Sequence, residues 1–133
     1  MSCYRKHIVI PGTLKGKKLI LTFEAVANAA DVYVNGQFAF SHKGSYTAFG
    51  GDIALFVKYD EDNVAVKVDS TERSDIPPFG RVVDYLVYGG IYREVYIYVH
   101  ESVYVEKLHL TPEDVLTQEP KLRVIAQYDK IIL

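Results

Sequence analysis

The residues with the most chemical content lie in one stretch, DYLVYGGIYREV at residues 84–95. It joins an acidic residue, Asp84, to two consecutive glycines and a strand-like alternation that carries Arg93. A guanidinium on the inward side of a strand is costly unless several of its five donors are paired. We therefore expect Arg93 to be half-buried and to face a carboxylate or a set of carbonyls. From the residues alone, the stretch is a structural anchor in which Asp84 pairs with Arg81 or Arg93.

The glycine pair in this stretch, Gly89 and Gly90, predicts an unusual backbone. Two glycines in succession are typical of a place where the chain needs a positive φ or passes so close to another segment that a side chain would block it. A second glycine signal is Asn35-Gly36, which stands between the two apolar arms of residues 31–40. Both of its residues tolerate φ > 0, so this pair predicts a two-residue hairpin turn.

The elements that position these residues are strands, because nearly every periodic segment alternates with period two. Residues 18–27 place Leu19, Leu21, Phe23, Ala25 and Ala27 on one face, and residues 64–68, 91–99 and 103–110 continue the pattern. We expect seven or eight strands and no helix, with residues 52–57 forming a short turn or strand. Short strands at about ten-residue spacing are typical of a sandwich or a barrel.

Length and composition indicate one folded core. At 133 residues, 49% apolar and 24% charged, the chain is an ordinary globular domain. Eleven tyrosines against no tryptophan indicate rings that either pack across strands or are presented to a ligand.

Charge and motifs exclude several classes of function. The formal net charge is −2, with the basic residues scattered, so the basic stripe of a nucleic-acid-binding protein is missing. The densest cluster of basic residues, LKGKK at residues 14–18, is expected to form a solvated turn. Its spacing does not match the phosphate-loop pattern. Cys3 is the single cysteine and the four histidines lack ligand spacing, so we expect no disulfide, metal or cofactor.

No signal peptide and no apolar run near 18 residues is present, so we expect no membrane partner and favour either a cytoplasmic protein or a piece whose targeting lies elsewhere. Residues 70–90 are too long for an ordinary hairpin, yet their many apolar side chains favour order. Residues 111–133 contain a polar turn and the strand KLRVIAQY, and the chain stops on three large aliphatic residues. This ending predicts a cut inside a longer polypeptide, with a first domain at residues 1–110. Residues 111–133 are then the beginning of a second domain or a C-terminal strand tail.

Five motifs in order resemble one family: YRK at residues 4–6, FEAVANAADVYVNGQ at 23–37, HKGSYTAF at 42–49, DNVAVKVD at 62–69, and DYLVYGGIYREV. The chain is similar over residues 4–110 to the N-terminal sugar-binding domain of glycoside hydrolase family 2, which contains β-galactosidases, β-glucuronidases and β-mannosidases. The resemblance implies an all-β, jelly-roll sandwich of the galactose-binding-domain type. It also implies a following immunoglobulin-like sandwich, whose first strands residues 111–133 resemble, and then a catalytic (β/α)₈ barrel.

The resemblance also implies roles for residues. The family's acid/base and nucleophile lie on the barrel, so no catalytic residue is expected here, and Glu61, Asp62, Asp69, Glu72 and Asp75 are expected to be solvated acids. Asp84 matches the position from which β-galactosidases of the family hold the sugar, where a carboxylate accepts charge-assisted hydrogen bonds from two hydroxyls. His42 and Tyr46 are expected to pack against the sandwich edge or a neighbouring domain, or else to contact sugar.

Two functions from different classes follow. The first is a non-catalytic fragment of a β-galactosidase-like enzyme that supports the barrel of the same polypeptide and contributes Asp84 to a pocket for β-galactosides. β-Glucuronidase or β-mannosidase specificity is the alternative within that class. The second is a free-standing carbohydrate-binding module that stacks tyrosines on pyranose rings. An interdomain or oligomer-forming sandwich is compatible with the first function.

Overall fold

The structure, a computed structural model, describes residues 1–59, 61–77, 79–80 and 87–130. The chain divides into two compact units, Met1–Val99 and His100–Leu133. Among the described residues there are eleven strands and a single 3₁₀ turn, η1 at Gly12–Leu14. The predicted all-β class is confirmed. The segments that alternate with period two form strands.

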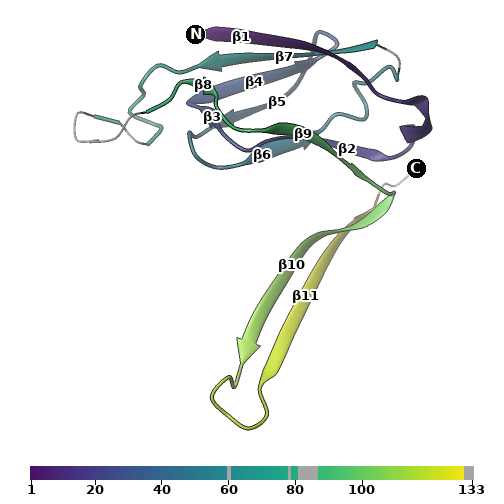
Figure 1. Ribbon diagram of the computed structural model, residues 1–133, viewed down its shortest axis with the longest axis vertical. Helices are drawn as coiled ribbons and strands as arrows, with labels where there is room; N and C mark the ends of the chain where they lie inside the picture. Colours follow the sequence, from purple (N-terminus) through teal and green to yellow (C-terminus); the bar gives the residue numbers. More distant parts are fainter. Residues whose placement is uncertain (60, 78, 81–86, 131–133) are drawn as a thin grey trace. The chain divides into compact units, whose positions relative to one another are not determined.

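The first unit contains two main sheets and a short strand pair (Figure 1). The larger sheet has the antiparallel order β1-β7-β4-β5, with strands Ser2–Val9, Glu61–Asp69, Ala29–Val34 and Gln37–Lys43. The smaller sheet has the order β6-β2-β9, with strands Phe49–Asp52, Lys18–Phe23 and Val95–His100. The pair consists of β3 at Val26–Ala27 and β8 at Gly90–Ile91. The two main sheets form separate layers that are not joined into a closed barrel in the described part, so the predicted sandwich is confirmed.

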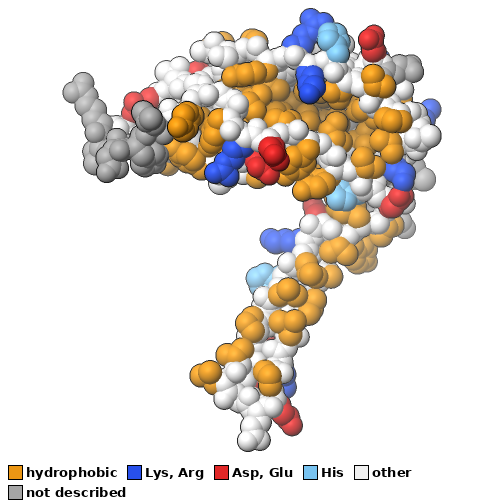
Figure 2. Space-filling model, in the orientation of Figure 1, with side chains coloured by type: hydrophobic (Ala, Val, Ile, Leu, Met, Phe, Trp, Pro, Cys, Tyr) orange, Lys and Arg blue, Asp and Glu red, His pale blue; other side chains and the backbone are white. Residues whose placement is uncertain are grey.

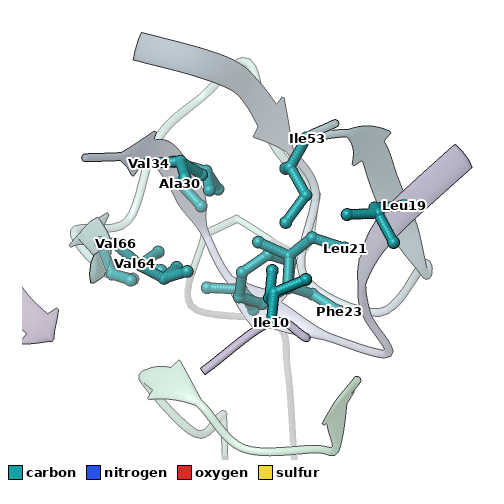
Figure 3. Close-up of a cluster of buried hydrophobic side chains, with 12 residues drawn as sticks. Ile10, Leu19, Leu21, Phe23, Ala30, Val34, Ile53, Val64 and Val66 are labelled. Carbon is teal, nitrogen blue, oxygen red and sulfur yellow. The ribbon is translucent and has the colours of Figure 1, made fainter. Parts of the chain in front are cut away.

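The core lies between the two layers of the first unit. Along β2 and β4 every second residue is buried, as a sheet with one inward face requires. Figure 3 shows aliphatic side chains from both layers converging on Phe23. The Phe23 ring stacks on Phe49 of β6 with centroids 5.0 Å apart and meets Phe40 of β5 edge-on at 6.4 Å. Phe23 therefore joins the two sheets.

Residues 18–27 form two strands rather than the single one predicted. β2 ends at Phe23 and β3 begins at Val26, and the backbone N–H of Glu24 donates to the carbonyl of Glu94 at 3.0 Å between them. The predicted inward residues are buried, but Val26 and Asn28 are buried as well. The chain bends here, so strict alternation ends at Phe23.

The predicted hairpin turn at Asn35-Gly36 is confirmed. It joins β4 to β5, and the two residues have φ values of 51° and 81°. The Asn35 amide also donates to the carbonyl of Phe56 at 2.9 Å and to Oδ1 of Asp62 at 2.6 Å. Asn35 therefore stabilises the fold in two ways: its backbone forms the turn, and its side chain donates hydrogen bonds to distant residues.

The expectation of a solvated Asp62 is wrong. Its side chain is completely buried on β7, because it shares the inward parity of Val64, Val66 and Val68. Oδ1 of Asp62 accepts from Asn35 and from the backbone N–H of Lys58 at 2.8 Å. These bonds compensate in part for burying a carboxylate.

The second unit is a long antiparallel hairpin of β10 at Val103–Glu113 and β11 at Lys121–Lys130, with a register shift between Val105 and Lys107. The predicted strand KLRVIAQY lies in β11. The predicted division after residue 110 falls inside β10, whereas the compact units divide after Val99. The assignment of residues 111–133 to a second domain stays a prediction.

One face of this hairpin is apolar and exposed. Cross-strand neighbours on it are Leu108 with Ala126, Leu110 with Val124, and Pro112 with Leu122. Leu110 and Val124 keep more than half of their surface exposed, at 52% and 54%, and Figure 2 shows hydrophobic side chains along the hairpin. The other face is mostly polar and includes an ion pair between Arg123 and Glu113 at 2.7 Å. A two-stranded hairpin that is isolated in water is marginally stable.

Candidate functional site

The candidate site is the end of the sandwich where the chain leaves β7, at Asp69, and returns in β8, at Gly90. Asp84 and Arg81 lie outside the described residues. Their flanks, residues 70–77, 79–80 and 87–92, are described. The geometry of these flanks shows how the chain on either side of Asp84 is held.

The prediction that Gly89 and Gly90 mark a positive φ or a close approach of another segment is confirmed, because the structure shows both features. Gly90 has φ +87°, and a Cβ there would collide with the hydroxyl of Tyr4 on β1. A Cβ on Gly89 would lie 3.0 Å from the Cβ of Ser70. The backbone N–H of Gly90 donates to Oγ of Ser70 at 2.9 Å, and that hydroxyl donates to the carbonyl of Ala27 at 2.7 Å. The chain therefore enters β8 in one fixed conformation.

Gly90→Ala is expected to lower the free energy of unfolding more than Gly80→Ala. Both residues have φ +87°, but a Cβ on Gly80 meets no atom within 4 Å. The shared cost of a positive φ for a non-glycine residue is about 1–2 kcal/mol, so the difference between the variants isolates the collision with Tyr4. Urea denaturation measures both values. Equal losses in the two variants would show that the approach of Tyr4 does not constrain position 90.

Asn28 connects three segments at this end, and sequence reasoning missed it. It is 8% exposed, and its amide donates to the carbonyls of Ser70 at 3.3 Å and Thr71 at 3.0 Å. Its Oδ1 accepts from Oγ of Ser45 at 2.5 Å, and its carbonyl accepts from the N–H of Gly44 at 2.8 Å. The only available signal was one amide inside the apolar run AVANAADVYV.

Charged side chains hold the described part of the loop that follows β7. Asp75 accepts from Nε of Arg73 at 2.9 Å and from Nζ of Lys43 on β5 at 3.0 Å. The bonds from Arg73 and then Lys43 lower the pKa of Asp75 well below its usual range. Ile76, 3% exposed, is buried next to this network. The expected exposure of Asp75 is confirmed, but the carboxylate is paired rather than only hydrated.

Tyrosines from three separate segments meet at this end. Tyr92, in the bend after β8, lies 6.5 Å from Tyr46 in the loop before β6 and 6.4 Å from Tyr88, measured between ring centroids. The hydroxyl of Tyr92 donates to the carbonyl of Ser45. The sequence pattern placed Tyr92 in a continuous strand, but the structure groups it with loop residues.

His42 packs on the sandwich. Its ring stacks on Phe49 with centroids 4.1 Å apart and planes 9° apart, and Nε2 lies 3.3 Å from Oγ1 of Thr47. Burial lowers the pKa of the His42 imidazole from its ordinary value of 6.5. The packing alternative for His42 therefore agrees with the structure, while a contact of His42 or Tyr46 with sugar stays a prediction.

The lowered pKa predicts that His42 titrates with a midpoint below 6.5 in the folded chain. In the pH interval between that midpoint and 6.5, the unfolded chain binds more protons than the folded one, so stability falls as the pH is lowered through it. Proton NMR of the imidazole Cε1–H measures the midpoint. Phe49→Leu removes the covering ring and is expected to move the midpoint upward; a midpoint at or above 6.5 in the unmodified chain would contradict the assignment.

The expected burial of Arg93 is wrong. β8 ends at Ile91 and β9 begins at Val95, so Arg93 lies in the bend between them and is exposed. The predicted strand over residues 91–99 is interrupted, which removes the inward parity on which the expected burial of Arg93 depended. The role of Arg93 as a structural anchor stays a prediction.

Two hollows lie in the described part of the first unit. A groove of about 640 Å³ lies between β1 and β9, and none of its lining residues is an acid. A smaller hollow of about 220 Å³ contains Asp31 and Asp69. Hydrogen bonds from the side chain and backbone of Thr71 lower the pKa of Asp69, and Lys67 pairs with Asp31 at 3.9 Å. A general acid for glycoside hydrolysis needs a raised pKa instead.

The described residues contain no group of three or more His, Cys, Asp or Glu side chains arranged to hold a metal ion. They also contain no helix of the length and apolarity that crossing a membrane requires.

The fold and the site together define a β-sandwich domain whose loops at one end hold a tyrosine cluster and flank Asp84. Residues 1–101 match the glycosyl hydrolases family 2, sugar binding domain. The chain belongs to this family.

Individual relatives agree with this family assignment. The chain is 45% identical to a β-galactosidase of Thermoanaerobacter pseudethanolicus, over 82% of this chain and 15% of that protein. It is 38% identical to a β-glucuronidase of Bacteroides fragilis, over 87% of this chain and 17% of that protein. Among solved structures, a β-glucuronidase of Bacteroides uniformis is similar with a TM-score of 0.84 and 28% identity, over 92% of this chain and 15% of that one. The chain thus spans less than one fifth of these relatives' length.

Proposed function

We propose that this chain is the non-catalytic N-terminal domain of a larger family 2 enzyme that hydrolyses terminal β-galactosides. In this proposal the domain supports the catalytic domain of the same polypeptide and contributes Asp84 to the sugar pocket. The observation that carries the proposal is the 45% identity to a β-galactosidase of which the chain covers only 15%. Retaining hydrolysis needs two carboxyl groups on either side of the glycosidic bond, one of them with a raised pKa. The larger hollow has no acid in its lining, and in the smaller one the pKa of Asp69 is lowered.

The second unit supports the same proposal. The apolar face of hairpin β10–β11 has the alternation of an inner sandwich face. Strands supplied by a longer polypeptide after Leu133 would bury it, which agrees with a second β-sandwich domain. The hairpin is then the beginning of that domain rather than an appendage of the first.

We propose galactose rather than glucuronate as the sugar because the chain is 45% identical to the β-galactosidase and 38% identical to the β-glucuronidase. The complete enzyme is expected to have a higher kcat/KM for nitrophenyl β-galactoside than for nitrophenyl β-glucuronide. The reverse order would refute the galactoside assignment while leaving the family unchanged.

Reading the coding region beyond Leu133 tests the fragment proposal. We expect further strands of a second sandwich and then a (β/α)₈ pattern with two acidic residues at strand ends. A stop codon directly after Leu133 in the intact gene would contradict the proposal and favour a free-standing carbohydrate-binding module.

A further inference from the structure

The tyrosine cluster at the candidate site has the geometry of a small platform. The rings of Tyr88 and Tyr92 are tilted by 31° to each other with centroids 6.4 Å apart. The ring of Tyr46 stands at 70° to that of Tyr92. The three rings together form a corner.

Hydrogen bonds in the interior hold this corner in place. The hydroxyl of Tyr92 donates to the carbonyl of Ser45, which directly precedes Tyr46. Ser45 is 2% exposed, and its Oγ donates to Oδ1 of the buried Asn28 at 2.5 Å. Tyr88 is followed by Gly89 and Gly90, whose backbone approaches Ser70 and Tyr4. The residues next to Tyr46 and Tyr88, and the hydroxyl of Tyr92, are therefore tied to the sandwich.

The rings are nevertheless not part of the core. Tyr88 is 64% exposed and Tyr46 is 46% exposed, whereas the Phe23 ring is 1% exposed. Tyr88 follows Asp84 by four residues in the sequence.

We propose that Tyr46, Tyr88 and Tyr92 form a stacking platform for a pyranose ring of the carbohydrate substrate, with Tyr88 as the main contact. The inference rests on the proposed function, because that function supplies a sugar as the occupant. A pyranose has a face of C–H groups and an edge of hydroxyls, and a tyrosine offers an apolar ring face with a polar hydroxyl at its tip. A rigid tyrosine also loses little conformational entropy on contact.

The period-two pattern over residues 91–99 would place Tyr92, Tyr96 and Tyr98 on one face of a strand, which is an argument against a platform of loop tyrosines. The structure removes that argument for Tyr92, which lies outside β9 and belongs to a cluster of loop residues. Tyr96 and Tyr98 remain on β9, where their rings pack against each other with centroids 4.8 Å apart. A single platform without the rest of the pocket binds weakly, so we expect the isolated chain to bind without saturating at millimolar sugar.

Saturation-transfer difference NMR tests the platform, because it detects weak contacts. The 133-residue chain is saturated in its aromatic region in the presence of methyl β-galactopyranoside. We expect transfer to the C–H protons of one face of the sugar, loss of that transfer in Tyr88→Leu, and its retention in Tyr88→Phe. Phe38→Leu is the control, since Phe38 is an exposed aromatic residue, 53% exposed, on the hairpin at the other end of β4 and β5.

The amide spectrum of each variant reports whether it is folded, and Tyr46→Leu replaces Tyr88→Leu if the latter is not. Absence of transfer in the unmodified chain, or equal transfer in Tyr88→Leu, would overturn the platform. The proposed function does not depend on this result, because it is judged by the reading frame beyond Leu133 and by turnover in the complete enzyme. A failed platform with an intact galactosidase activity would therefore reject only the inference on the tyrosines.

Discussion

Asp84→Ala in the complete enzyme is expected to raise KM, lower kcat, and reduce kcat/KM for nitrophenyl β-galactoside by about 10²- to 10⁴-fold. A hydrogen bond to a charged group contributes about 1.5–3 kcal/mol, and a carboxylate that holds one sugar accepts such bonds from two hydroxyls. If Asp84 has the proposed role, its removal leaves both hydroxyls without their partner. Steady-state kinetics of the two enzymes measures the change.

Asp31→Ala is the control for this experiment. Asp31 is a half-buried carboxylate on β4 that pairs with Lys67 at 3.9 Å, and pairs near the surface contribute little. Its removal should leave the kinetic constants unchanged. If Asp84→Ala also leaves them unchanged but lowers the free energy of unfolding, Asp84 is the partner of Arg81 or Arg93 in a structural ion pair.

Phe23→Ala is expected to lower the free energy of unfolding by about 3–5 kcal/mol, as large-to-small changes of a buried aromatic residue do. Phe23 is 1% exposed and contacts Phe49 of one sheet and Phe40 of the other. Its loss opens a cavity at the place where the two layers meet. Urea denaturation followed by circular dichroism measures the loss.

Phe38→Ala removes the same ring from a surface position. Phe38 is 53% exposed and contacts Tyr33 edge-on with centroids 5.7 Å apart. Losing that aromatic pair costs about 0.5–1.5 kcal/mol. Similar losses for Phe23→Ala and Phe38→Ala would contradict the placement of the core between the two sheets.

The sequence predicted features that depend on neighbouring residues along the chain. Asn35 and Gly36 form a hairpin turn because both tolerate φ > 0. The period-two pattern placed Leu19, Leu21 and Phe23 in the core because a strand alternates its faces. Gly89 and Gly90 marked a close approach, although the partners, Ser70 and Tyr4, could not be named in advance.

The features that the sequence did not predict depend on residues far apart in the chain or on breaks in a strand. The strand expected over residues 91–99 stops at Ile91, and this break exposes Arg93 and moves Tyr92 to the loop cluster. Asp62 lies on the inward parity of β7, and its carboxylate is satisfied in part by the side chain of Asn35, which is distant in the sequence. Asn28, between β3 and β4, connects residues 44–45 and 70–71, which come close to it only in the folded chain.

The most direct test of the central claim, that this is a folded family 2 domain without its own catalytic centre, is an assay of the purified 133-residue chain with nitrophenyl β-galactoside. Circular dichroism first establishes that the chain has its β-structure. We predict that the folded chain releases nitrophenol at the rate of the enzyme-free blank. Turnover above that blank in a sample free of other glycosidases would contradict the claim.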